Sequence, residues 1–430
     1  MRAFFAWWII ATGAATCPAQ IYKSDLPIDH PAIGYFQTPA QSLEDPVSRL
    51  IRQIDAGKRK LAWRDDGLGY LPSLLENLGI NTNSQALPFA KGSFQAAKIS
   101  PRNPRAIYFT DDVAAGWVRG GTGVELASLD PRQGVIFYDV VRSSSGEPVF
   151  NRPQVCLNCH RGAATNGVPG MFVGSVIPNP LGEPQRLGAI ITDHRTRFED
   201  RWGGWYITAK SGEQRDRANS VAPDPAEPET LDNEGKQNLT SLARFFNPAG
   251  YLTPLSDIVA LMTFEHQTQM QNLLTRLGWL ARMGADEQTL RSETEDTVAY
   301  MLFAEEEPLR EPIEGASTFT RTFPERGPRD RKGRSLRDFD LRTRLFRYPL
   351  SYAIYSAQFD ALPDAVRGRV YRRLYEVLSG QDQSPRFARI SAADRRAILE
   401  ILRDTKPNLP AYFQQTGQGV VLRQGERRPG

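Results

Sequence analysis

The feature that most constrains this chain is a pentapeptide, Cys156-Leu157-Asn158-Cys159-His160, which holds two of its three cysteines. The third, Cys17, lies near the N-terminus. Because cysteine is so scarce in 430 residues, the chain is not a small scaffold held together by disulfides. It must bury a hydrophobic core instead, and its length allows one large domain or two to three smaller ones.

Residues 1–19 have the pattern of a secretory signal peptide. Arg2 is the only charge in this segment, an apolar run follows over residues 3–15, and small residues lead to Ala19. The run is too short to span a bilayer. We expect cleavage after Ala19, a periplasmic or secreted protein, and no membrane span in the mature chain. Lipoprotein processing at Cys17 and a buried N-terminal helix are the alternatives.

After cleavage, Cys156 and Cys159 are the only cysteines of the mature chain. Cys-x-x-Cys-His is the attachment sequence for haem c: the two thiols bind the vinyl groups of the porphyrin, and the histidine supplies the proximal iron ligand. We therefore predict one covalent haem c, with His160 as the proximal ligand. Three alternatives remain: a redox disulfide, which does not require His160, a zinc site, which would need a fourth ligand, and a structural disulfide, which would be strained across two residues.

The pentapeptide resembles the haem-binding sequence of c-type cytochromes. Residues 202–206 and 256–267 are similar to stretches of large bacterial monohaem proteins of unassigned role. The C-terminal segments 371–378 and 391–405 resemble the helical ending of a cytochrome c domain, which packs across the haem-bearing helix. The resemblance implies a haem domain built from residues near 150–180 and from these C-terminal helices, with a large helical insertion between them.

The second axial ligand of such an iron would come from a short list of histidines and methionines. His266 shares one face of an expected helix with Met262 and Met270, since these residues recur every four positions. His194 lies in a polar segment, and Met171 lies in a loop rich in Gly and Pro. His266, His194 and Met171 are all candidate distal ligands. Each also fits an ordinary packed or surface side chain, and a vacant position is a further alternative.

Composition and periodicity divide the chain into consecutive regions. We expect a signal peptide over residues 1–19 and an N-terminal region of helices and strands over 20–145. A haem c attachment region over 146–210 and a loop or linker over 211–254 follow. A helical region over 255–430 completes the haem domain. The predicted fold class is α+β and predominantly α-helical: a cytochrome c-like haem domain with a β-containing N-terminal region and a large helical insertion.

The expected elements follow from hydrophobic spacing. Helices are predicted over residues 44–57, 69–79, 256–282, 286–307, 341–360, 363–379 and 391–404. Short strands are predicted at 107–109, 116–118, 124–126 and 135–138, as an antiparallel meander, and at 172–177 and 205–208. The arginine-rich segment 314–338 is predicted to be a loop, either simply solvated or a docking surface for an acidic partner or for the haem propionates.

The functional alternatives are an electron carrier and an enzyme. A net charge of +4 disfavours nucleic-acid binding, and no motif of a common hydrolase or nucleotide enzyme is present. We expect a monohaem c-type cytochrome that transfers electrons to a redox partner protein. The alternative is a haem c enzyme of the peroxidase, oxidase or oxygenase type with an open distal site, because a carrier needs only about 80–120 residues. No catalytic residue is assigned.

Overall fold

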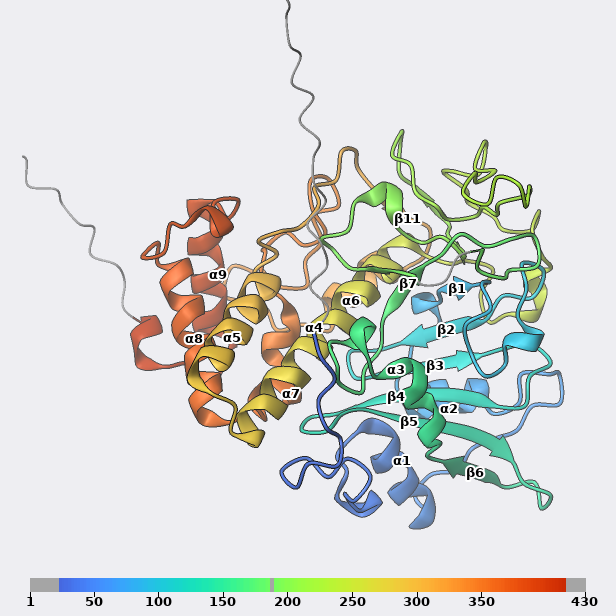
Figure 1. Ribbon diagram of the computed structural model, residues 1–430, viewed down its shortest axis with the longest axis horizontal. Coiled ribbons are helices and arrows are strands. Elements are labelled where there is room, and N and C mark those ends of the chain that lie inside the picture. The colour runs from blue at the N-terminus through green and yellow to red at the C-terminus, as the bar shows by residue number, and fades with distance from the viewer. Residues whose placement is uncertain (1–22, 186–188, 415–430) are drawn as a thin grey trace, which may run out of the picture.

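The computed structural model describes residues 23–185 and 189–414 (Figure 1). The predicted signal peptide over residues 1–19 lies outside this part of the chain, as do residues 415–430. The described residues form a mixed fold in which helices contribute more residues than strands, so the α+β class is confirmed. None of the helices in the described part combines the length and hydrophobicity that a membrane span requires.

The predicted meander is present as a five-stranded antiparallel sheet directly before the pentapeptide. Its strands pair in chain order: β2 (Ala106–Phe109), β3 (Val113–Trp117), β4 (Val124–Asp130), β5 (Gly134–Arg142) and β6 (Pro148–Asn151). The strands are longer than predicted, and the edge strand β6 was not predicted. It pairs only four residues with β5 and is partly exposed. Its sequence, Pro-Val-Phe-Asn, lacks the alternation of hydrophobic and polar residues from which a strand is predicted.

Both faces of the sheet are covered. Alternate residues of its strands, such as Tyr108, Leu126 and Tyr138, share a buried cluster with α1 (Pro46–Asp55) and α2 (Leu71–Asn77). The intervening residues, such as Phe109 and Phe137, belong to a second cluster with the C-terminal helices. The period of two in a strand thus assigns successive side chains to two different cores.

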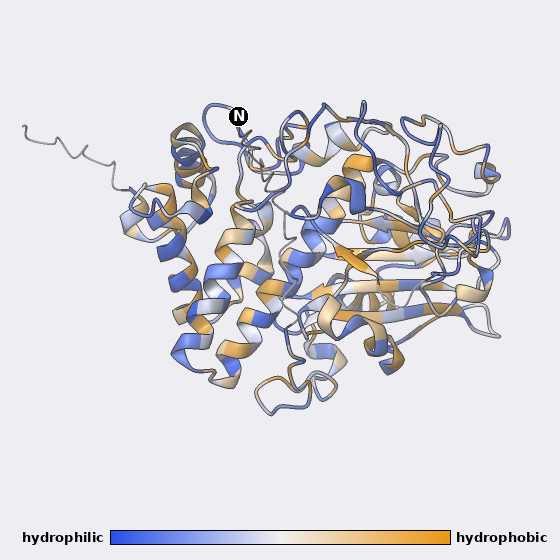
Figure 2. Cartoon of the chain, turned by 45° about the horizontal axis from the view of Figure 1, so that its top comes forward, coloured by the Kyte–Doolittle hydropathy of each residue, from blue (hydrophilic) through white to orange (hydrophobic). Residues whose placement is uncertain are grey.

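The second cluster is organised around α4 (Ile258–Met283), which runs between the sheet and the helical part of the molecule (Figure 1). The Asp257 carboxylate caps its N-terminus by accepting hydrogen bonds from the N–H groups of Val259 and Ala260. Gly284, in a left-handed conformation, ends it. Beyond α4 lie α5 (Glu287–Met301), α8 (Asp364–Leu378) and α9 (Ala392–Thr405), along which hydrophobic and hydrophilic residues alternate in bands (Figure 2).

Short elements connect these parts. Two-stranded pairs are formed by β1 (Leu87–Pro88) with β9 (Trp205–Tyr206), β7 (Val173–Ser175) with β8 (Ile190–Thr192), and β10 (Ala209–Lys210) with β11 (Glu314–Gly315). The short helices are α3 (Leu157–His160), α6 (Phe319–Glu325) and α7 (Ala357–Asp360). Residues 211–254, all of which the structure describes, contain one 3-10 helix, Pro248–Gly250, and neither an α-helix nor a strand.

The helix predicted over residues 341–360 is wrong. This stretch is irregular up to a 3-10 helix, Tyr352–Tyr355, and the short α7. Leu341 has φ of +56°, which an α-helix excludes. The Asp340 carboxylate accepts hydrogen bonds from three successive backbone N–H groups, those of residues 342, 343 and 344. A turn stabilised by a side chain therefore replaces the helix that the apolar spacing suggested.

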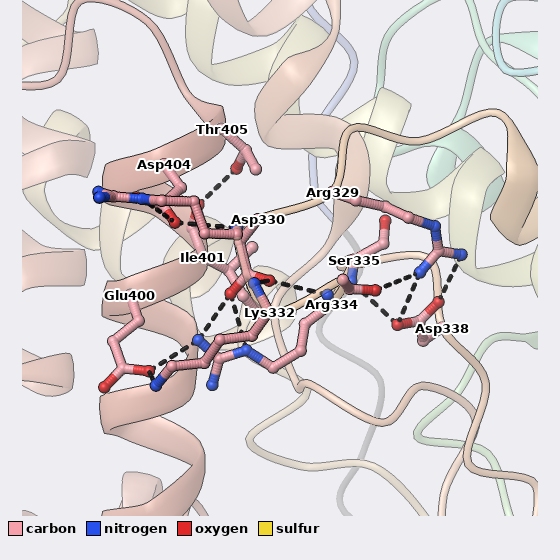
Figure 3. A network of polar contacts seen from close by, with 12 residues as sticks. Arg329, Asp330, Lys332, Arg334, Ser335, Asp338, Glu400, Ile401, Asp404 and Thr405 are labelled. Atoms are coloured by element: carbon pink, nitrogen blue, oxygen red, sulfur yellow. Dashed lines mark hydrogen bonds and ion pairs between the residues drawn. The ribbon is translucent and has the colours of Figure 1, made fainter.

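The prediction of a loop over residues 314–338 is also wrong in part, because the segment contains β11 and α6. Its arginines are paired within the chain. Figure 3 shows Arg334 between Asp330 and Glu400, and Arg329 beside Asp338. The remaining arginines of the segment also form ion pairs. Arg326 and Arg337 share Asp111, Arg321 pairs with Glu325, and Arg331 pairs with Asp404. This pairing disfavours a docking surface that relies on unmatched positive charge.

Candidate functional site

The two cysteines of the pentapeptide flank the first turn of α3, which lies in front of the sheet in Figure 1. Cys156 precedes the helix and packs against the hydrophobic cluster that contains α4, whereas Cys159 is exposed. Both are free thiols. The fold therefore presents two unpaired sulfur atoms about one helical turn apart, one turned toward the core and one toward solvent.

His160 is held by the loop that follows α3. Its Nδ1 lies 3.0 Å from the carbonyl oxygen of Gly170, and the Gly170 N–H donates to the carbonyl oxygen of His160 at 2.9 Å. Since a carbonyl only accepts, Nδ1 carries the proton and Nε2 keeps its lone pair. No described residue forms a hydrogen bond with Nε2. The ring of Phe137 lies 4.8 Å from the imidazole and that of Phe172 lies 5.7 Å from it.

The environment keeps both His160 and Cys156 uncharged. Burial lowers the pKa of His160 to about 4, against a smaller opposing effect of the Gly170 carbonyl. Burial raises the pKa of the Cys156 thiol to about 11, and the carboxylates of Glu125 and Asp139 add to the increase. A neutral imidazole with a free Nε2 is the form of histidine that ligates a metal.

Charged side chains of the sheet lie around this position. Glu125 and Asp139 are directly opposite each other on β4 and β5, and Arg105 forms an ion pair with Glu125. Three buried polar atoms here have no hydrogen-bond partner: Arg105 Nε, Arg152 Nη2 and Asp139 Oδ1. Two of them are guanidinium donors, which suit a carboxylate ligand.

These residues fit haem c. The two free thiols, the free Nε2 of His160 and the unpartnered guanidinium atoms of Arg105 and Arg152 match the vinyl groups, the iron and the propionates of that cofactor in chemical type. The carbonyl bonded to Nδ1 is the kind of outer contact that orients a ligating histidine. No cluster of three or more His, Cys, Asp or Glu residues that could hold a metal ion by itself occurs in residues 23–185 and 189–414.

The candidate ligands His194 and His266 contact each other. Their Nδ1 atoms lie 2.9 Å apart, and both residues are fully enclosed. His266 Nε2 lies 2.9 Å from Ser351 Oγ, and Tyr300 stacks on the His266 ring with an interplanar angle of 2°. His194 Nε2 is buried without a partner. Burial lowers the pKa of His266 to about 3 and also lowers that of His194, so both are neutral near pH 7.

A buried ion pair lies next to these histidines. Arg201 Nη1 donates to Glu265 Oε1 at 2.7 Å, and Trp202 Nε1 donates to Glu265 Oε2 at 3.0 Å. Burial raises the pKa of Glu265 to about 7, although the Arg201 charge opposes the increase. Sequence reasoning did not single out Arg201. The sequence feature that could have led to Arg201 is the pair of stretches 202–206 and 256–267. In the fold, the hydrogen bond from Trp202 to Glu265 joins these two stretches.

Met171, the third candidate, is buried. It follows Gly170, and its carbonyl oxygen accepts a hydrogen bond from Asn272 Nδ2 at 2.8 Å. Gly170 contacts Nδ1, the ring nitrogen away from Nε2. Met171 therefore follows directly on the residue that binds His160 Nδ1.

Comparison with known proteins adds no assignment. No protein-family model matches the chain, and neither the curated proteins nor the solved structures include a significant match. The function must therefore be argued from the site. Of the residues singled out from the sequence, Cys156, Cys159 and His160 lie together in the pentapeptide, and the fold brings His194 into contact with His266.

Proposed function

We propose that the chain is a periplasmic or secreted monohaem c-type cytochrome, which binds haem covalently at Cys156 and Cys159 and transfers single electrons. His160 is the proximal ligand. The observation that carries this proposal is the double hydrogen bond between His160 and Gly170, which leaves Nε2 free beside two free thiols. A cytochrome c-like domain around this motif belongs to the same proposal.

The residues of the chain orient and tune this site. The Gly170 carbonyl selects the imidazole tautomer with the proton on Nδ1 and makes Nε2 a stronger donor. Arg105 and Arg152 are the residues suited to the propionates, since each has a guanidinium atom without a partner. When bound, haem c supplies reversible one-electron chemistry between ferric and ferrous iron, at a potential set by its ligands and by its exposure to solvent.

The exposure of the motif supports electron exchange with a partner protein. Cys159 is exposed, and the side chain of Val155 is 46% accessible. A covalently attached group at this position would therefore have one side near the surface. A partly apolar surface around such a group is typical of the weak contacts made by redox partners.

A second candidate function, a haem enzyme with an open distal position, is favoured by one observation. His194 contacts His266, His266 contacts Ser351, and Met171 directly follows the residue that binds His160 Nδ1. Among the described residues, no hydrogen bond or ring contact joins His160 to any of the three candidate ligands. An iron bound there would have its sixth position available to water or to a small substrate.

Covalent attachment is tested on the full chain expressed with a haem c attachment system. The Cys156→Ala/Cys159→Ala variant should lose the haem band on a denaturing gel, whereas His160→Gly should retain it with an altered visible spectrum. Haem that survives denaturation in the double variant would contradict attachment at these thiols. A low-spin spectrum identical to wild type in His160→Gly would contradict proximal ligation by His160.

The two functions are separated by the spectrum of the reduced protein with and without carbon monoxide. A low-spin spectrum unchanged by carbon monoxide would support an electron carrier with a firmly held sixth ligand. A high-spin spectrum that shifts strongly with carbon monoxide would support the enzyme, and peroxide, oxygen and small organic substrates would then be tested.

A further inference from the structure

A second candidate site lies away from the pentapeptide, where the turn between β2 and β3 meets α4 and the segment 351–358. It is a cavity of about 150 Å³, and no residue of the pentapeptide lines it. Its lining combines polar and apolar side chains, among them Asp112, Leu129, Met270, Gln271, Arg337 and Ser351. The cavity therefore needs an explanation separate from haem binding.

Two nearly buried side chains of the lining each have one polar atom without a hydrogen-bond partner among the described residues. Gln271, 5% accessible, has an unused acceptor at Oε1, and Arg337, 6% accessible, has an unused donor at Nε. Both side chains are fixed by Asp111. Gln271 Nε2 donates to its carbonyl oxygen at 2.6 Å, and the Arg337 guanidinium pairs with its carboxylate. Because buried polar atoms normally have partners, a ligand that offers both a donor and an acceptor is expected here.

The charges around the cavity compensate one another. The Asp111 carboxylate pairs with both Arg326 and Arg337. Asp112 is only partly buried, and the positive charges of Arg49, Arg326 and Arg337 act on its carboxylate. A cation would therefore meet three guanidinium groups, and an anion would meet two aspartates. Since neither sign of charge gains from this arrangement, an uncharged ligand fits it best.

Hydrogen bonds hold the walls of the cavity in place. The Gln267 side chain, part of the lining, donates to the Thr110 carbonyl oxygen and accepts from the Tyr352 hydroxyl, both at 2.8 Å. At another wall, Gln358 Nε2 donates to Thr275 Oγ1 at 2.8 Å. A site fixed in this way before binding loses little entropy when a ligand enters.

We propose that this cavity binds a small uncharged primary amide. Its N–H groups would donate to Gln271 Oε1, and its oxygen would accept from Arg337 Nε. A short alkyl group would contact Leu129 and Met270, which provide apolar surface in the lining. A primary amide suits both unused atoms because it carries two donors next to one acceptor. The cavity has room for such a molecule, since one of similar volume holds benzene.

The proposal is tested by saturation-transfer NMR on the full chain at pH 7, with three probes of similar size. Propionamide is uncharged, propionate is an anion and n-propylammonium is a cation. We expect saturable binding of propionamide with a Kd on the order of 1 mM, which is within the range for so small a ligand. The two charged probes should bind about tenfold more weakly or not at all, because their charges lose hydration without gaining a partner.

Three variants locate the binding. Gln271→Met keeps the length of the side chain but removes the acceptor, and should weaken propionamide binding about fivefold or more. Arg337→Lys keeps the positive charge but removes Nε, and should weaken it by a similar factor. This second variant tests the site independently if Gln271→Met does not fold. Asp112→Asn removes a charge that an uncharged ligand does not need, so the Kd should change by less than about twofold.

Three results would overturn the proposal. They are the absence of saturable transfer from propionamide in the wild type, tighter binding of either charged probe, and an unchanged propionamide Kd in a folded Gln271→Met or Arg337→Lys variant.

Discussion

His160 and Gly170 are joined by two hydrogen bonds: the imidazole Nδ1 donates to the Gly170 carbonyl oxygen, and the Gly170 N–H donates to the carbonyl oxygen of His160. This pair connects the last residue of α3 to the loop that follows it. Asn272 of α4 packs against Gly170 and binds the next carbonyl, that of Met171. The orientation of the histidine therefore depends on the contact between the loop and α4.

Substitution of Gly170 tests this dependence. In Gly170→Ala the new Cβ would collide with the Asn272 side chain. We expect a loss of about 1–3 kcal/mol in the free energy of unfolding, measured with urea. We also expect a higher midpoint potential of bound haem, since a weaker bond to Nδ1 makes Nε2 a poorer donor to ferric iron. Gly92→Ala, at an exposed site where a Cβ meets nothing within 4 Å, is the control and should change stability by less than about 0.5 kcal/mol. Equal effects in the two variants would contradict the role of Gly170.

The second prediction concerns Met171. Met171→Leu should leave the oxidised and reduced visible spectra of the haem-loaded protein unchanged, because Met171 follows the residue on the Nδ1 side of His160. The stability cost should stay below about 1.5 kcal/mol, since the replacement has a similar volume. A change in the spin state of the iron in this variant would instead identify Met171 as an axial ligand.

The third prediction concerns the buried pair Glu265 and Arg201. Glu265→Ala should reduce the free energy of unfolding by about 3–5 kcal/mol, because it leaves Arg201 and the Trp202 indole without their acceptor. Glu265→Gln should cost less, since its amide oxygen still accepts from one of the two donors and the neutral carboxyl is already accessible at a pKa of about 7. Glu314→Ala, which breaks an exposed ion pair with Lys210, is the control for loss of a carboxylate. Similar urea midpoints for all three variants would contradict a structural role for the buried pair.

The fourth prediction is a loss of stability in acid. Burial lowers the pKa of His266 to about 3, whereas an unfolded chain protonates it near 6.5. The unfolded state therefore binds more protons between these values, and stability falls as the pH falls from about 6.5 toward 3. Well below 6.5 the contribution of His266 is about 1.4 kcal/mol per pH unit.

The measurement compares urea unfolding of the wild type and His266→Gln at several pH values from 7 to 4. Glu265 acts with the opposite sign, because its raised pKa makes stability fall as the pH rises from about 4.5 to 7. The difference between the two proteins removes this contribution. The variant should lose stability less steeply on acidification, and identical slopes would show that His266 is not held neutral by the fold.

Local pattern predicted much of the secondary structure. The meander over β2–β5 and the helices α4, α8 and α9 follow from alternation and helical spacing, which depend on neighbours in the chain. The wrong prediction of a helix over residues 341–360 also has a local cause, which the hydropathy pattern does not show. A single carboxylate, that of Asp340, satisfies three backbone N–H groups and competes with the helix.

The sequence by itself bounded the spacing of Cys156, Cys159 and His160, because residues so close in the chain cannot lie more than about 14 Å apart whatever the rest of the fold does. Only the tertiary structure decided that His194 binds His266, 72 residues away, and that Arg201 pairs with Glu265. It alone also formed the cavity lined by Asp112, Gln271 and Ser351. Such contacts depend on which buried faces pack together, and hydrophobic spacing shows that a face is buried without showing its partner.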